Sequence, residues 1–185
     1  MHHDITPLAS SGFADAVEGL AAVLADAVEG GASLGFLAPF GPAEAAAWWR
    51  DRAPSVEDGS LRVWAVHDGA GLCGTVSLGL EHRANGRHRA EVTKLIVHRR
   101  ARGRGLAGAL LTTAEQAAAA AGATLLLLDT ESGSAAEGLY LHRGWTRHGT
   151  VPGFATDPAG RLRDGSFFHK PLTTADASPA SGAPA

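Results

Sequence analysis

The sequence has only one cysteine in 185 residues, and this scarcity excludes two kinds of protein. Cys73 has no partner in the chain for a disulfide, and a cysteine-based zinc site needs at least two cysteines. The nine histidines show no ligand spacing such as H-E-x-x-H, so we expect no metal. We therefore predict a metal-free protein of a reducing compartment, with Cys73 as a small residue of the core.

Long apolar runs and a large excess of one charge are missing as well. The longest weakly apolar run, residues 117–128, is well short of the ~20 residues that a membrane-spanning helix needs. The first residues lack a basic segment followed by an apolar one, so we expect no secretory signal. The 16 basic and 19 acidic residues give a net charge of −3, which disfavours a nucleic-acid binder. We expect a cytoplasmic protein with neither membrane nor nucleic-acid partners.

Hydrophobic patterning divides most of the chain into helices and strands. The patterns predict helices at 13–28, 42–52, 106–121 and 135–142, and strands at 61–67, 72–80, 90–97, 124–129, 145–154 and 166–172. The strand at 124–129 is a short, unbroken apolar run, which is typical of burial on both faces. With 45% hydrophobic residues the chain suffices for one core. We predict a single mixed α/β domain over residues 1–172, followed by a disordered tail over 173–185.

The junction between the predicted strand 90–97 and helix 106–121 is rich in glycine and arginine. It contains Gly103 and Gly105 among four arginines, Arg99, Arg100, Arg102 and Arg104. The free N–H groups and dipole of a helix N-terminus attract anions, and glycine permits close backbone approach. The junction therefore predicts a site for a phosphate-bearing ligand. The alternative is an ordinary turn with solvated arginines.

Two common phosphate-binding patterns fit this junction poorly. Gly103, Gly105 and Gly108 satisfy G-x-G-x-x-G, and Asp129 ends the next predicted strand, as in a dinucleotide site. However, residues 98–102 separate the first glycine from its strand, and a hairpin rather than a βαβ unit precedes it. A P-loop is excluded because no Gly-Lys-Ser/Thr follows.

Two longer motifs fit the chain better. Residues 102–107 match a pyrophosphate loop of the form Q/R-x-x-G-x-G/A, and residues 136–145 match A-x-x-L-Y…G-F/W. In these motifs and in element order over about residues 4–172, the chain resembles the GNAT family of acetyl-CoA-dependent N-acetyltransferases. Segments 31–39, 128–133, 151–155 and 167–170 resemble the branch that contains tabtoxin-resistance acetyltransferase. The resemblance implies a mostly antiparallel central sheet flanked by helices, with a V-shaped splay between two central strands.

The resemblance also implies acetyl-CoA as co-substrate and a set of residues that hold it. The backbone N–H of Leu95 is implied to polarise the thioester carbonyl. The implied cofactor residues are Leu95, Ile96, Val97, Arg102, Gly103, Arg104, Gly105, Leu106, Ala107, Gly108 and Ala136.

Three side chains are candidates for the chemistry. An amine of pKa ~10 is mostly protonated at neutral pH, so a carboxylate must help to remove a proton. By the resemblance, Glu91 is a candidate base, and its alternative role is an ion pair with an arginine. Asp129 either attracts the substrate ammonium and shares the base role or caps the following turn. Tyr140, the only tyrosine, is implied to donate a proton to the leaving thiolate, and its alternative is an ordinary half-buried ring.

The acceptor is expected to be a small primary amine. The branch-like segments and the acidic residues Glu91, Asp129 and Glu131 favour an amino-acid-like metabolite or antibiotic, which leaves a resistance role open. Residues 31–40 either wall the acceptor site or only connect two helices, and Trp48 and Trp49 either floor it or pack in the core. The alternatives are an acyl-CoA-binding sensor and an acetyltransferase of protein N-termini or lysines. A homodimer is compatible with each of them.

Overall fold

A seven-stranded mixed sheet forms the centre of the computed structural model, which describes residues 4–173. Its strand order is β1-β2-β3-β4-β5-β7-β6. The strands are β1 (Ile5–Pro7), β2 (Leu61–Asp68), β3 (Gly71–Leu80), β4 (Arg89–Val97), β5 (Leu125–Glu131), β6 (Thr146–Thr156) and β7 (Leu162–Pro171). All neighbours pair antiparallel except β4 and β5, which are parallel. The expected mostly antiparallel sheet is confirmed, whereas all but the first residue of the expected tail lie outside the described residues.

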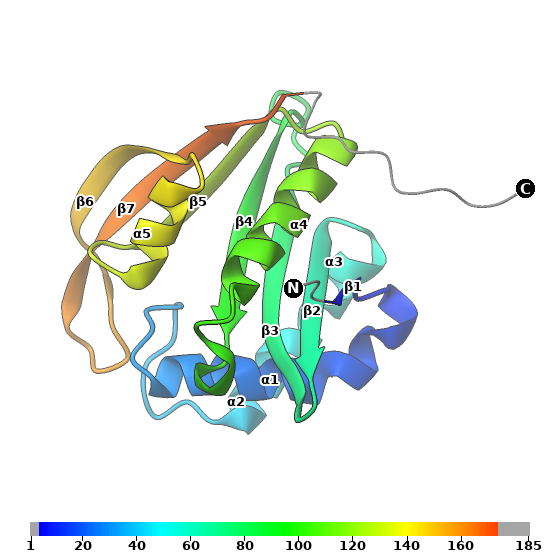
Figure 1. Cartoon of the computed structure of the whole chain (residues 1–185), viewed down its shortest axis with the longest axis vertical. Helices are drawn as coiled ribbons and strands as arrows, with labels where there is room; N and C mark the ends of the chain where they lie inside the picture. The colour runs from blue at the N-terminus through cyan, green and yellow to red at the C-terminus, as the bar shows by residue number, and fades with distance from the viewer. Residues whose placement is uncertain (1–3, 174–185) are drawn as a thin grey trace, which may run out of the picture.

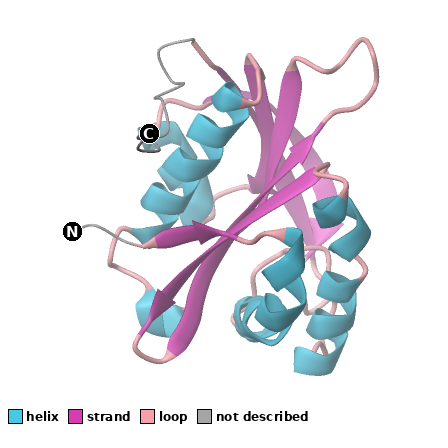
Figure 2. Ribbon diagram, turned by 90° about the vertical axis from the view of Figure 1, so that its right-hand side faces the viewer, coloured by secondary structure: helices cyan, strands magenta, loops and turns pink. Residues whose placement is uncertain are grey.

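Helices cover both faces of this sheet (Figure 2). α1 (Ser10–Glu29), α2 (Pro42–Arg50) and α3 (Ala53–Glu57) pack into one core, and α4 (Leu106–Ala120) and α5 (Ala135–His142) pack into the other. β2 shows how one strand serves both cores, because alternate side chains point to opposite faces. Val63 and Ala65 lie in the α1 core, while Trp64 and Val66 lie in the α4 core.

The structure adds three short elements and corrects one expectation about burial. β1, α3 and the 3₁₀ helix η1 (Arg99–Ala101) have three to five residues each, too few for a periodic pattern. The prediction that strand 124–129 is buried on both faces is wrong. Leu126 and Leu128 are buried, but Leu125 and Leu127 are only partly buried and Asp129 is exposed. The reason is that core helices cover one face of β5, while the other borders an open hollow.

β4 and β5 separate soon after they begin to pair, which produces the expected splay (Figure 1). Their register covers three pairs and ends at Glu91 and Leu127. Beyond that point β4 stays with β3 and β5 stays with β7. Loss of pairing between two central strands opens the sheet at its middle, beside Glu91 and Asp129.

A β-bulge lies in β4 just beyond the last pair with β5. Thr93 pairs with Ser77 and Ile96 pairs with Thr75, so one residue of β3 faces both Lys94 and Leu95. Lys94 has φ +49°, and it is the one residue other than glycine with positive φ in the described chain. Because a bulge leaves its extra residue out of the ladder and bends the strand, it redirects side chains at this position.

Candidate active site

The strand-to-helix junction forms the first part of the site. Gly105 is the N-cap of α4, and no side chain caps the helix or places a negative charge in its first turn. Gly103 and Gly105 have φ of +76° and +77°, the left-handed conformation that favours glycine. A hollow of about 210 Å³ lies against this helix start. The backbone N–H groups at the start of α4 are therefore open to an anionic ligand.

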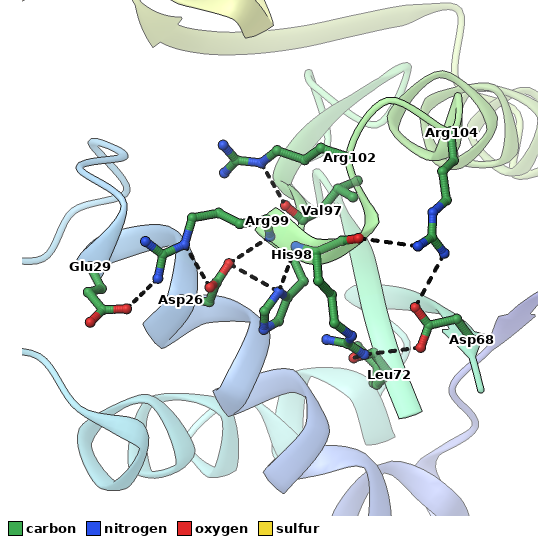
Figure 3. A network of polar contacts seen from close by, with 10 residues as sticks. Asp26, Glu29, Asp68, Leu72, Val97, His98, Arg99, Arg102 and Arg104 are labelled. Atoms are coloured by element: carbon green, nitrogen blue, oxygen red, sulfur yellow. Dashed lines mark hydrogen bonds and ion pairs between the residues drawn. The ribbon is translucent and has the colours of Figure 1, made fainter. Parts of the chain in front are cut away.

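Ion pairs fix three of the four arginines of this junction (Figure 3). Arg99 binds Asp26 of α1, with Nε 2.8 Å from Oδ1, and also contacts Glu29. Arg100 and Arg104 lie 3.1 and 3.6 Å from the carboxylate oxygens of Asp68, at the end of β2. These carboxylates balance three of the four arginines, so the junction is a braced structure rather than a solvated turn.

Arg102 is the arginine of the junction without a carboxylate partner within residues 4–173. Its Nε donates to the backbone oxygen of Val97 at 3.2 Å (Figure 3). Arg102 also lines the first hollow. The charge of Arg102 is therefore available to a bound anion.

The structure gathers most, but not all, of the predicted cofactor residues around this hollow. Leu95 lies in the β4 bulge, and the side chain of Ile96 packs in the α1 core, so the backbone of Ile96 is what remains for a ligand. Arg104 turns toward Asp68, and Ala136 packs against the α4 core. Those that line the hollow are Val97, Arg102, Gly103, Gly105, Leu106, Ala107 and Gly108.

Two lining residues from the end of α5 have no place in the predicted set. Leu139 and Arg143 are four residues apart and thus share one side of the helix end. The Arg143 guanidinium lies over Gly108, where an added Cβ would be 2.1 Å from Nη2, and Nη1 donates to Thr112 Oγ1 at 3.2 Å. The A-x-x-L-Y motif pointed to Leu139, but no local pattern reveals that Arg143 folds back over α4.

A second hollow, of about 260 Å³, lies on the α1–α2 side of the splay. It is lined by Ser33, Leu34, Gly35, Val92, Thr93, Lys94, Asp129, Thr130, Glu131, Phe154, Ala155, Arg163, Asp164 and Gly165. The first hollow is bordered by α4 and α5, so the two hollows approach the splay from opposite faces of the sheet. This arrangement suits two ligands that meet through the gap between β4 and β5.

The loop between α1 and α2 is a wall of the second hollow. Ser33 Oγ donates to the backbone oxygen of Thr156 at 3.1 Å, and Ala38 N donates to that of Pro158 at 2.8 Å. These bonds hold the loop against the hairpin of β6 and β7. Trp48 supports the loop through an edge contact with Phe36, with ring centroids 5.7 Å apart. Trp49, by contrast, is fully buried in the core.

Glu91 and Asp129 lie at the mouth of the splay. No hydrogen bond or ion pair within residues 4–173 engages either carboxylate, so neither the arginine pair nor the turn cap is observed. Glu91 and Asp129 are exposed residues, but their carboxylates lie in a concave site that removes part of their solvent, and this desolvation raises the pKa of both above the ordinary values. The charge of Asp129 raises the pKa of Glu91 further. The nearby Lys94 opposes both shifts. A carboxylate with a raised pKa is a better proton acceptor near neutral pH.

Tyr140 lies on the opposite side of the sheet, in the core that α4 and α5 share. Its ring packs against Trp145 and Phe168, with centroids 5.9 and 5.8 Å away. Burial, together with the charge of Asp129, raises the pKa of Tyr140 to about 12. Its hydroxyl engages no other described residue in a hydrogen bond. At neutral pH the group is protonated and can donate a proton.

Lys94 is a charged residue of the second hollow that the sequence analysis missed. Its Nζ donates to the backbone oxygen of Leu34 at 3.2 Å and lies 5.1 Å from the ring centroid of Trp48. Burial lowers the pKa of Lys94, while Asp129 and Glu91 oppose that shift. No sequence signal places this side chain in the site, because its direction depends on the bulge.

Two features are absent from the described residues. Between residues 4 and 173, no helix combines the length and the apolar character needed to cross a bilayer. Across the same residues, no three histidine, cysteine, aspartate or glutamate side chains gather as metal ligands would.

Comparison with known families decides how this site is classified. The model of the acetyltransferase (GNAT) family matches residues 31–145, which is more than half of the chain. The chain belongs to the GNAT acetyltransferase family. The matched segment runs from the loop between α1 and α2 to Trp145. It therefore includes the residues that β4, the junction and α5 contribute to the two hollows.

Solved structures agree with this fold at low sequence identity. A phosphinothricin acetyltransferase from Sinorhizobium meliloti in complex with acetyl-CoA is 18% identical, with a TM-score of 0.76 over 98% of this chain and 94% of that chain. A ribosomal-protein-alanine N-acetyltransferase from Brucella melitensis is 24% identical, with a TM-score of 0.68 over 91% and 99%. The yncA protein of Salmonella typhimurium, solved with its cofactor acetyl-CoA, is 19% identical, with a TM-score of 0.68 over 100% and 99%. Because the named acceptors differ, the shared fold leaves the acceptor open.

Proposed function

We propose that this GNAT protein transfers the acetyl group of acetyl-CoA to a primary amine of a small, amino-acid-like molecule. The observation that carries the proposal is a pair of hollows on opposite faces of the sheet beside the β4–β5 splay. Asp129 lines the second hollow, Glu91 lies at the last β4–β5 pair, and neither carboxylate has a partner among the described residues. The first hollow has the character of an anion site, and the second hollow is small and lined by charged residues.

The first hollow fits a ligand that carries phosphates. The uncapped start of α4, the open space above Gly103 and Gly105 and the free charge of Arg102 suit a pyrophosphate. Arg143 adds a second cation on the far wall. Acetyl-CoA would supply an activated acetyl thioester at this site, and two structural neighbours were solved with it.

The chain's own groups then have separate tasks. Glu91 and Asp129 accept a proton from the acceptor ammonium, directly or through water, so that the neutral amine can attack. The Leu95 N–H, in the bulge, donates a hydrogen bond to the developing oxyanion. Tyr140 donates a proton to the departing sulfur, in keeping with a pKa of about 12 that keeps its hydroxyl protonated.

The second hollow supports a small acceptor. Its volume of about 260 Å³ lies below the ~300–1,000 Å³ typical of pockets for drug-sized ligands. Three of the segments that resemble the tabtoxin-resistance branch, 31–39, 128–133 and 151–155, each contribute residues to its wall. The likeness to a phosphinothricin acetyltransferase points the same way.

Thiol release from acetyl-CoA tests the proposal across amino acids, β-lactam-like amino acids, aminoglycosides, polyamines and peptides. We expect turnover with at least one amino-acid-like amine. Acetylation limited to protein N-termini or lysine side chains would overturn the small-molecule acceptor but not the acetyl transfer.

A melting experiment tests the cofactor independently of any acceptor. Acetyl-CoA at about 100 times its dissociation constant should stabilise the fold by about 2.7 kcal/mol, which corresponds to a rise in Tm of about 5–11 °C for a chain of this size. A rise with NADH and none with millimolar acetyl-CoA would refute the assignment of the first hollow.

A further inference from the structure

The second hollow contains two cations with very different surroundings. Arg163 is held by Asp157, with Nη2 3.0 Å from Oδ2, and lies 3.6 Å from Glu131. Lys94 forms no ion pair with any described residue, although it lines the same hollow. Asp129 is likewise without a partner, whereas Asp164 accepts a hydrogen bond from Gly153 N at 2.8 Å. With respect to the described part of the chain, the hollow therefore contains one unpaired ammonium and one unpaired carboxylate.

The backbone presents Lys94 to the hollow at an energetic cost. A positive φ is unfavourable for a residue with a Cβ, and such strain concentrates at functional sites. Glycine would fit the bulge more easily. The conformation is thus not explained by backbone preference, and its visible consequence is a lysine side chain on the wall of the hollow.

Aromatic rings and one carbonyl hold the ammonium in place. Nζ lies 5.1 Å from the centroid of Trp48 and 5.8 Å from that of Phe36, within the range of cation–π attraction. Its hydrogen bond to the Leu34 oxygen uses one of three N–H donors. The other N–H groups remain for a ligand, and a partly buried cation such as Lys94 gains from an anionic partner.

We propose that Lys94 binds an acidic group of the acceptor, so that the preferred acceptor is a zwitterion whose amine lies toward Asp129. The inference rests on the proposed function, because it names the chemistry that the second hollow selects. A carboxylate, or another oxyanion of similar size, would pair with the Lys94 ammonium, and the substrate ammonium would pair with Asp129. A polyamine would instead place a second cation beside Lys94, which is unfavourable.

Paired acceptors test this selection. Thiol release is measured with a set of L-amino acids and with the primary amide of each, which keeps the amine but removes the acidic group. The measured quantity is the ratio of kcat/KM for the acid to kcat/KM for its amide. In wild type we expect the acids to be preferred, and Lys94→Met should lower the ratio about 10- to 100-fold, the usual range for a hydrogen bond between charged groups. Lys94→Arg should retain much of the preference.

Two controls separate recognition from structure. Arg62→Met removes one positive charge from an exposed position of β2 and should leave the ratio unchanged. If Lys94→Met does not fold, Lys94→Gln carries the same comparison, because its amide can still donate to the Leu34 oxygen.

The outcomes are distinct. An equal loss of activity toward acids and amides in the Lys94 variants would assign the residue a structural role and overturn the inference. A wild-type preference for amides or for amines without an acidic group would overturn it as well, with acetyl transfer intact. No thiol release with any amine would refute the proposed function itself.

Discussion

At the scale of single residues, the carboxylates with a shifted pKa fall into two groups that differ in the direction of their pKa shift. Hydrogen bonds lower the pKa of structural carboxylates such as Asp68, Glu137 and Asp157, each of which accepts from backbone N–H groups and arginines. Glu91 and Asp129 show the opposite shift, and no such donor reaches them from residues 4–173. Groups with raised pKa in a concave site are candidates for acid–base chemistry, because a fold gains little stability from them.

Glu91→Gln tests the base. Because the amide cannot accept the amine proton, kcat should fall by about 10²- to 10⁴-fold, the usual contribution of a general base. In wild type, the acidic limb of kcat/KM should lie above the ordinary glutamate pKa of 4.5, since burial raises the pKa of Glu91. Glu18→Gln is a matched control, because its pair with Arg50 is exposed. A wild-type rate in Glu91→Gln across the pH range would remove the residue from the mechanism.

Tyr140→Phe tests the acid. The ring contacts with Trp145 and Phe168 remain, and the lost hydroxyl leaves no described partner unsatisfied, so the melting temperature should change little. The kcat should fall by about 10²- to 10⁴-fold, while the KM for acetyl-CoA stays near its wild-type value. Steady-state kinetics together with calorimetry check this prediction, and an unchanged kcat would contradict it.

At the scale of elements, the site depends on two local irregularities, the glycine turn before α4 and the bulge in β4. The turn is predictable from sequence, because glycines next to a helical pattern leave a local signal, as Gly103 and Gly105 do. The bulge at Lys94 is not, because a positive φ in a residue other than glycine follows from strand pairing rather than from composition. The fold class and the junction could therefore be predicted, but the direction of Lys94 could not.

Contacts between distant elements were equally inaccessible to the sequence. Arg99 and Asp26 are 73 residues apart, and Arg100 and Asp68 are 32 apart, so no local spacing pairs them. The burial of β5 was misjudged for the same reason. Its apolar run is typical of a strand covered on both faces, and only the tertiary arrangement leaves one face open to the second hollow.

Gly105→Ala tests the turn. Since φ is +77°, an alanine there is strained by about 1–2 kcal/mol although its Cβ would meet no atom within 4 Å. The free energy of unfolding should fall by that amount, and the KM for acetyl-CoA should rise more than that for the acceptor.

Gly12→Ala in α1 is the matched control for this variant. Its added Cβ also meets nothing within 4 Å, and its φ is not positive, so it should stabilise the protein by about 0.5–1 kcal/mol. Denaturant unfolding measures both variants. Equal effects in the two would show that backbone conformation at Gly105 does not matter.

At the scale of the whole molecule, the two cores meet across a sheet that is incomplete at its centre. The β4–β5 register ends at Glu91 and Leu127, so the loop between α1 and α2 and the β6–β7 hairpin must close the gap from one side. This opening leaves several partly desolvated charged groups at the splay, and their desolvation is unfavourable for folding. Stability and activity should therefore respond in opposite directions when one of these charges is removed.

The pH dependence of Asp129→Asn tests whether this carboxylate lowers the stability of the fold while it supports activity. The pKa of Asp129 in the folded state lies above the unfolded value of 3.8, so between these values the folded state binds more protons, and stability falls as pH rises through that window. The destabilising effect of the carboxylate is absent at low pH and complete at neutral pH. The Tm of Asp129→Asn minus that of wild type should thus be larger at pH 7 than at pH 4, while activity at pH 7 drops.

Asp157→Asn is a comparison in which the lost carboxylate stabilises the fold instead of destabilising it. Hydrogen bonds, chiefly from Arg161, lower the folded pKa of Asp157 below 3.8, so its stabilising effect is lost only as pH falls through a window beneath that value. Its variant should be less stable than wild type by a similar margin at pH 7 and pH 4. Calorimetry of wild type and both variants at pH 4 and pH 7 measures these differences in Tm. If the difference between Asp129→Asn and wild type is the same at both pH values, the carboxylate of Asp129 is fully solvated and the splay imposes no electrostatic cost.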